Sequence, residues 1–310
     1  MELHEVEEII SCLAGDRTKF YYFRDRYALM LLTDYITEKV GEKPISVAEL
    51  KRSCFANLLN KTPVKKALAQ SGNGYITAKD LEMIWDENPL AFVVTLGQWG
   101  SGKKEWRWKQ MSRSGYHLVL QLNMATDHTQ QLQKLIRPED AHTFNYWGHP
   151  SLTKGDRGTL AWVRLDLDFE TDEVLIEEIQ CDWIRKVRSA VKYDYSWYGD
   201  YSKAELEAYA NDVLEPYAKI WQEAMLAATI DFVRNELGIK QVYYHSFENG
   251  ARLKNIGHSK PPRSLYTQLP KQFGFKKSWY APEFLMREKK IKYFQERVEE
   301  PCWFRLPVSS

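Results

Sequence analysis

The sequence predicts an α+β fold, in which an N-terminal helical module is followed by a mixed β-sheet with flanking helices. Apolar residues recur at helical spacing over residues 20–40. Segments 160–169 and 174–183 alternate with the period of two that is typical of strands. A largely apolar helix over 217–237 then leads to a short strand at 241–246, which indicates a strand–helix–strand unit with parallel, adjacent strands.

Length and composition exclude several classes of protein. The chain has 310 residues, of which 44% are hydrophobic and 14% aromatic, enough for one large or two ordinary domains. Because the net charge is +1, nucleic-acid binding would have to come from a local basic patch. The four cysteines are far apart, and the acidic start lacks the features of a signal peptide. No apolar run reaches membrane-spanning length, so we expect a cytoplasmic protein with no membrane partner.

Capping signals divide the chain into a helical module over residues 1–88 and a second domain over 89–310. Ser46-x-x-Glu49 and Thr77-x-x-Asp80 predict helix starts, and the glycines at 72 and 74 predict a turn. The basic residues of this module also permit a winged helix. A helical module with a solvated basic face is the simpler interpretation.

One face of the strand at 174–183 carries Glu178, Gln180 and Asp182 in succession, whereas Glu177 falls on the apolar face. Buried polar groups without partners are costly, so these three either face a wet cleft or satisfy one another. If the apolar faces of the two strands coincide, Arg164 lies beside Glu178 and keeps it ionised. A functional site and a structural network both explain this pattern.

The segment that follows the strand at 90–96 combines tryptophans with basic residues. Its members are Trp99, Lys103, Lys104, Trp106, Arg107 and Trp108. Cations beside flat aromatic rings suit phosphates and stacked bases, which predicts a nucleic-acid or protein partner. The alternative is a hairpin whose tryptophans pack on the sheet.

Residues 249–277 form a basic run without any Asp or Glu. Its cations include Arg252, Lys254, Arg263 and Lys271. The run follows the strand at 241–246, and ligands of open α/β sheets bind at the carboxyl ends of strands. We therefore predict phosphate binding here, with a solvated face as the alternative.

The histidines give no metal-ligand spacing, so no metal site is predicted. His117 is interpreted as a satisfied core histidine, and His149 lies in a polar loop. A metal-dependent hydrolase that uses Glu178 and Asp182 lacks further ligands in the sequence.

The run Glu178-Ile179-Gln180-Cys181-Asp182-Trp183 resembles the Glu-Ile-Gln-Ser-Asp-Trp motif in the large polyvalent proteins of phages and prophages. The resemblance continues through Trp221, Gly238 and Val242 to Tyr266-x-x-Leu269-Pro270-Lys271, about the C-terminal half. It implies a mobile-element origin. Because Cys181 replaces the serine of the motif, Cys181 is not expected to be an essential nucleophile.

The order of elements in the same half is similar to the GNAT acyltransferase fold. This resemblance implies transfer of an acyl group from acetyl-CoA or another acyl-CoA to an amine, with Glu178 as base, Tyr266 as general acid and Asn249 near the donor. GNAT enzymes hold the CoA pyrophosphate on a glycine-rich turn before the buried helix. Here Gly199 is the only glycine between Ile184 and Gly238, and an insertion near 184–215 occupies that place.

Two functions therefore remain open. The first is a GNAT-like transferase whose catalytic set is Arg164, Glu178, Gln180, Asp182 and Tyr266, with Asn249 and the basic run binding the cofactor. The second is a non-catalytic accessory factor of mobile-element origin that binds nucleic acid or protein through the Trp loop and the basic run.

Overall fold

The computed structural model describes residues 1–12, 17–100, 110–152, 155–193, 197–256 and 261–308. The fold is α+β, with a large mixed sheet flanked by helices, in agreement with the predicted class. No helix in the described ranges combines the length and the apolar character needed to cross a membrane.

The chain forms two compact units, each assembled from three segments. The first unit contains Met1–Tyr22, Leu90–Leu167 and Ile176–Thr229, and the second contains Phe23–Pro89, Asp168–Leu175 and Ile230–Ser310. One change of unit falls between Pro89 and Leu90, beside the predicted domain boundary. The division into domains at residue 88 stays a prediction.

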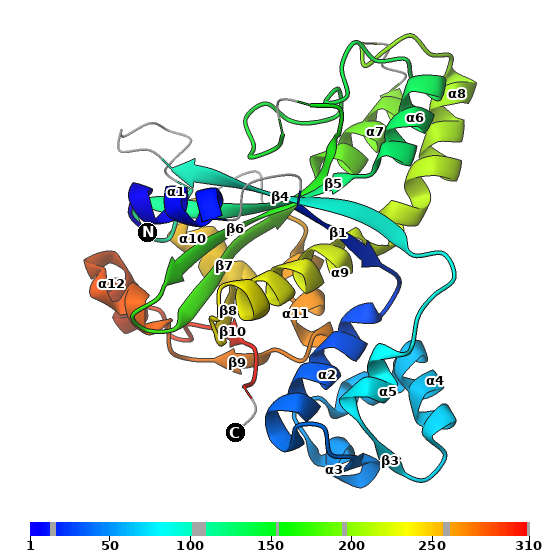
Figure 1. Ribbon diagram of the computed structural model, residues 1–310. Helices are drawn as coiled ribbons and strands as arrows, with labels where there is room; N and C mark the ends of the chain where they lie inside the picture. Colours follow the sequence, from blue (N-terminus) through cyan, green and yellow to red (C-terminus); the bar gives the residue numbers. More distant parts are fainter. Residues whose placement is uncertain (13–16, 101–109, 153–154, 194–196, 257–260, 309–310) are drawn as a thin grey trace. The chain divides into compact units, whose positions relative to one another are not determined.

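The first unit contains neighbouring strands in the order β1-β4-β5-β6-β7 (Figure 1). Their bounds are β1 Arg17–Tyr22, β4 Leu90–Gly100, β5 Tyr116–Met124, β6 Thr159–Asp168 and β7 Glu173–Gln180. β5 and β6 are antiparallel, with Val119 opposite Arg164 and Leu118 opposite Leu165. Almost every residue of β6 and β7 is buried. The polar side chains of these strands therefore lie inside the protein.

The predicted hairpin at 160–169 and 174–183 is confirmed in its first part only. β6 and β7 are neighbours joined by a short turn, in which Asp172 has a left-handed backbone with φ 54°. β7 ends at Gln180, and helix α7 begins at Asp182. Asp182 and Trp183 were expected on the strand, so their predicted faces are wrong.

The helices of the first unit include one long, almost unbroken stretch. The bounds are α1 Leu3–Cys12, α6 Thr126–Leu135, α7 Asp182–Tyr193, α8 Lys203–Ala208 and α9 Glu215–Asp231. A π-helical segment, Tyr209–Leu214, joins α8 directly to α9, and another, Phe232–Glu236, follows where the chain has entered the second unit. Gly238 has φ 72° and ends this helix as predicted. Since α9 continues an earlier helix, its first N–H groups are not a free helix end.

The N-terminal part of the second unit contains several helices, whereas residues 20–22, which were predicted at helical spacing, belong to strand β1. Its elements are α2 Arg26–Val40, α3 Val47–Arg52, α4 Thr62–Ser71 and α5 Ala78–Glu82, with a two-stranded pair formed by β2 Ile45–Ser46 and β3 Tyr75–Ile76. Figure 1 shows α2, α3, α4 and α5 gathered together. Both predicted capping boxes are present, at Ser46–Glu49 and Thr77–Asp80. Residues at helical spacing on α2, including Tyr27 and Leu31, are buried.

The C-terminal part of the second unit contains short strands and helices. The bounds are β8 Gln241–His245, α10 Phe247–Leu253, α11 Gln268–Gln272, β9 Lys276–Ser278, α12 Lys289–Arg297 and β10 Trp303–Arg305. β10 pairs antiparallel with both β8 and β9. The start of β7 belongs to this unit, and β7 is the neighbour of β8 in the strand order. The predicted adjacency of these two strands is confirmed.

Candidate active site

Arg164 and Glu178 form a closed ion pair, and the predicted contact between them is confirmed. Nη2 of Arg164 donates to one carboxylate oxygen of Glu178, and Nε2 of Gln180 donates to the other. The Arg164 and Glu178 side chains are only 1% and 3% exposed. Arg164 also donates to the Gln110 carbonyl at 2.9 Å and lies over the Trp99 ring at 5.2 Å. Glu178 is thus enclosed by protein groups on both oxygens.

Asp182 forms a second carboxylate centre at the first turn of α7. Its Oδ2 accepts from Nδ1 of His149 at 2.6 Å and from Nε1 of Trp162 at 3.4 Å. Its Oδ1 accepts from Nη2 of Arg185. The Asp182 side chain is 5% exposed, whereas the His149 side chain is 21% exposed. The buried carboxylate therefore holds an imidazole that reaches solvent.

The imidazole of His149 has a fixed orientation. Tyr146 contacts its ring at a centroid distance of 4.7 Å and Trp162 at 5.2 Å, both edge to face. The backbone beside it is held as well, because the Pro150 carbonyl accepts from Gln121 at 3.0 Å. An ionised carboxylate can only accept, so Nδ1 carries the hydrogen. In the neutral ring Nε2 is then an acceptor, and it makes no hydrogen bond to any residue that the structure describes.

Sequence reasoning missed His149. It lies 33 positions before Asp182 in a loop with no regular spacing, and only the three-dimensional structure brings the two together. One signal for the helix was present: Ile184, Val187 and Ala190 recur at helical spacing and are buried. That pattern indicates a helix starting near Asp182.

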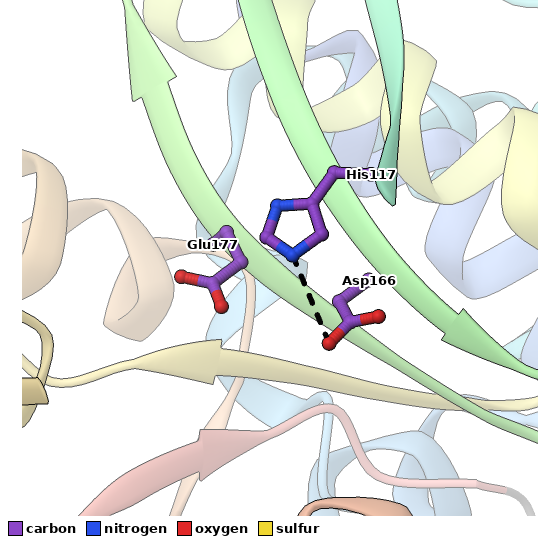
Figure 2. Close-up of side chains that lie close together, drawn as sticks. All are labelled: His117, Asp166 and Glu177. Atoms are coloured by element: carbon purple, nitrogen blue, oxygen red, sulfur yellow. Dashed lines mark ion pairs between the residues drawn. The ribbon is translucent and has the colours of Figure 1, made fainter. Parts of the chain in front are cut away.

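A third polar cluster joins His117, Asp166 and Glu177, which come from β5, β6 and β7. Their candidate ligand atoms all lie within 4.8 Å of one another. Figure 2 shows the imidazole of His117 between the two carboxylates, with the ion pair to Asp166 dashed. Burial lowers the pKa of His117 to about 4, so the ring is neutral near pH 7.

The position of Glu177 corrects the expected face pattern. Alternation placed Glu177 on the apolar face and Glu178 on the polar one. In the structure Glu178 contacts Arg164, and Glu177 lies near Asp166, two residues further along the same face of β6. Both consecutive carboxylates therefore reach one face of β6, and strict alternation does not describe this part of β7.

The other predicted site residues lie in the second unit. Tyr266 is 2% exposed, with its ring 5.4 Å from that of Tyr244 and Nζ of Lys254 at 5.7 Å. Asn249 is buried and donates to the Cys302 carbonyl at 2.7 Å. These two side chains are part of the interior of this unit. Their roles as general acid and cofactor ligand stay predictions.

The basic run contains cations in different environments. Lys254 is buried, whereas Arg252, Arg263 and Lys271 are exposed. Arg263 pairs with Glu248 at 2.5 Å, just before the run, so part of its charge is neutralised. A phosphate site here stays a prediction.

The Trp loop lies mostly outside the described residues, since Lys103, Lys104, Trp106, Arg107 and Trp108 fall within 101–109. Trp99 is described and is only 8% exposed, packed with Met111, Val119 and Trp162. Trp99 is thus a core residue, which agrees with the alternative interpretation for this position, and the partner prediction for the loop stays a prediction.

Cys181 stands where the motif has serine. Burial raises the pKa of its thiol to about 12, so the reactive thiolate is not populated near neutral pH.

Comparisons with known proteins add no assignment: no protein-family model, no curated protein and no solved structure is significantly similar to this chain.

Proposed function

We propose that the protein is a group-transfer enzyme in which His149, oriented by Asp182, is the general base. The acyl-transfer form of this proposal, from a CoA-type donor to an amine, follows from the resemblance in the order of elements to GNAT enzymes. The observation that carries the proposal is the 2.6 Å contact between Nδ1 of His149 and the buried Asp182 carboxylate. The side chain of His149 itself is one-fifth exposed.

This assignment moves the base from Glu178 to His149. A general base must reach the proton it removes, within about 3 Å or through one water. Both oxygens of Glu178 are engaged by Arg164 and Gln180, inside the protein. Nε2 of His149 is an acceptor at the solvent side of its pair. A histidine also changes its charge near neutral pH, which suits proton transfer.

The proposed step balances with these two residues. The amine nitrogen attacks the thioester carbonyl, a C–N bond forms, and its proton passes to Nε2 of His149. Asp182 stabilises the resulting imidazolium through Nδ1–H. When the C–S bond breaks, the sulfur leaves and takes the proton from Nε2. Asp182 acts through His149 and is therefore a positioning residue.

The mode of donor binding departs from the GNAT pattern. In that resemblance a helix N-terminus cradles the pyrophosphate. Here α9 continues directly from α8 through the segment Tyr209–Leu214, so its N-terminus offers no such cradle. A CoA-type donor would depend on cationic side chains instead.

The test is an assay of thiol release from acetyl-CoA and longer acyl-CoA compounds, with lysine peptides and polyamines as acceptors. We expect turnover by the intact chain and a loss of roughly two to four orders of magnitude in His149→Gln. His142→Gln is the matched control, because His142 lies in the same loop and its ring contacts Asn145 rather than a carboxylate. Equal activity in both variants, with both folded, would remove His149 from the mechanism.

A second function is favoured by a different observation. Large aromatic and cationic side chains near this site in the sequence are exposed: Trp147 by 73%, Trp197 by 71% and Arg185 by 64%. Such groups suit single-stranded nucleic acid. If no acyl donor is turned over, and single-stranded DNA or RNA binds with a steep salt dependence, the accessory-factor function replaces the transferase.

A further inference from the structure

His117, Asp166 and Glu177 form a cluster apart from the proposed base, and the strand register explains it. Leu118 lies opposite Leu165 on the antiparallel pair β5 and β6, so His117 and Asp166 are the next facing positions. Glu177 comes from β7, the next strand in the order. One imidazole and two carboxylates are thus held on three adjacent strands, with ligand atoms within 4.8 Å of one another (Figure 2).

His117 is the unexplained member of this cluster. Its side chain is 1% exposed, and neither ring nitrogen has a hydrogen-bond partner among the described residues. An unsatisfied buried polar atom costs about 1–3 kcal/mol, so a ligand that bonded to this imidazole would stabilise the folded chain. A core histidine with satisfied nitrogens, as the sequence suggested, is therefore wrong for this position.

The spacing of the atoms fits a shared ligand better than a direct bond. Nε2 of His117 lies 3.8 Å from Oδ2 of Asp166, too far for a hydrogen bond. Two ligands on one Zn²⁺ ion, each bonded at about 2.0–2.2 Å, lie about 3–3.5 Å apart. A small inward movement of the side chains would complete this geometry.

Neighbouring donors orient the two carboxylates. The backbone N–H of Ser112 donates to Oε1 of Glu177 at 3.0 Å. Arg113 donates to both oxygens of Asp166, at 3.0 and 2.7 Å, and the amino group of Met1 lies 3.4 Å from Oδ1. Each carboxylate oxygen has two lone pairs, so Asp166 can keep Arg113 and still bind a cation. Such outer contacts are typical of metal ligands.

We propose that His117, Asp166 and Glu177 bind one divalent transition-metal ion inside the first unit. One imidazole with two carboxylates suits Zn²⁺ or Mn²⁺ better than Ca²⁺ or Mg²⁺, which prefer all-oxygen sites. The cation of Arg113 offsets part of the carboxylate charge.

The experiment uses the untagged full chain, because an affinity tag would add metal ligands and an N-terminal extension would displace the amino group of Met1. The protein is stripped with a chelator, then titrated with Zn²⁺, Mn²⁺ and, as a spectroscopic probe, Co²⁺. Bound metal is counted by elemental analysis, and binding is followed by thermal shift and visible absorption. We expect one equivalent of metal per chain and a rise in melting temperature.

Glu177→Gln is the main variant, because it keeps the shape and removes one ligand charge, and His117→Gln is the second. Each should lower the affinity at least tenfold. His4→Gln, an exposed histidine, and His149→Gln should bind like the wild type, which separates this site from the His149–Asp182 pair. Circular dichroism shows whether each variant is folded. Absence of stoichiometric binding by the wild type, or full binding by folded Glu177→Gln and His117→Gln, would overturn the proposal.

Discussion

Two carboxylates four residues apart, Glu178 and Asp182, have opposite surroundings. Glu178 lies on β7 with Arg164 and Gln180 on its two oxygens, and the Arg164 and Glu178 side chains are buried. Asp182 opens α7, and its partner His149 is one-fifth exposed with Nε2 outside the pair. In the first pair both carboxylate oxygens accept hydrogen bonds from neighbouring side chains. The second leaves one acceptor that a substrate can reach.

This difference shows why a charged side chain on a polar strand face is a poor guide to function by itself. An arginine is always protonated near neutral pH, so Arg164 itself cannot accept a proton. A histidine with its Nδ1 held by a carboxylate can. We therefore assign the structural role to the closed pair and the chemical role to the open one.

The largest effect on stability is expected from Glu178→Gln. The change leaves Arg164 buried without its counter-charge, and breaking a buried pair in this way costs roughly 3–5 kcal/mol. Equilibrium unfolding in denaturant measures the loss. Asp182→Asn serves as the comparison and should cost less, because Arg185 and His149 are exposed to solvent and do not stay buried and unpaired. A Glu178→Gln protein of wild-type stability would show that the closed pair does not hold the fold together.

How much of this comparison the sequence could predict depends on the kind of contact. The Arg164–Glu178 pair followed from alternation on two consecutive strands, because cross-strand neighbours are fixed once the apolar faces are aligned. The starts of α3 and α5 followed from their capping boxes, which are local signals. The structure contains these predicted features because short-range geometry determines them.

Contacts between distant segments could not be predicted. His149 lies in an irregular loop, and no pattern places it against Asp182. Glu177 does not follow the alternation of β7. The alternation rule that predicted the Arg164–Glu178 pair therefore could not predict the cluster of His117, Asp166 and Glu177. Trp99 shows the reverse case, because a residue type that suits ligand binding is here buried in the core.

His128 is a buried histidine whose partner is a tyrosine hydroxyl, in contrast to His149, whose partner is a carboxylate. Burial lowers the pKa of His128 to about 3, and its Nε2 lies 3.0 Å from the Tyr209 hydroxyl. Below pH 6.5 the unfolded chain binds a proton on this residue that the folded chain does not, so stability falls as pH decreases toward 3. The slope from His128 approaches about 1.4 kcal/mol per pH unit.

The measurement compares unfolding free energies at pH 6.5 and 4.5 in the wild type and in His128→Gln. We expect the variant to lose about 2–3 kcal/mol less over this interval. If the stabilities of the two proteins depended equally on pH, folding would not lower the pKa of His128, and the prediction would be wrong. Asp34, whose pKa burial raises to about 6, contributes the opposite slope in both proteins and cancels in the comparison.

The smallest effect is expected from Arg185→Gln. Arg185 contacts Asp182 but is 64% exposed, and a salt bridge with an exposed partner contributes about 0–1 kcal/mol. Thermal unfolding at low and high salt measures this contribution, and we expect a change below about 1 kcal/mol that decreases with salt. A loss of several kcal/mol would mean that Asp182, like Glu178, needs its cation for folding.

The most direct measurement of the central claim is turnover per folded molecule, with stability measured on the same preparation, for His149→Gln and Glu178→Gln in the thiol-release assay. We predict that His149→Gln remains as stable as the wild type within about 1 kcal/mol and loses roughly two to four orders of magnitude in turnover. Glu178→Gln should be strongly destabilised, while its folded fraction keeps wild-type turnover. A stable but inactive Glu178→Gln protein, beside a fully active His149→Gln protein, would contradict the account and return the role of base to Glu178.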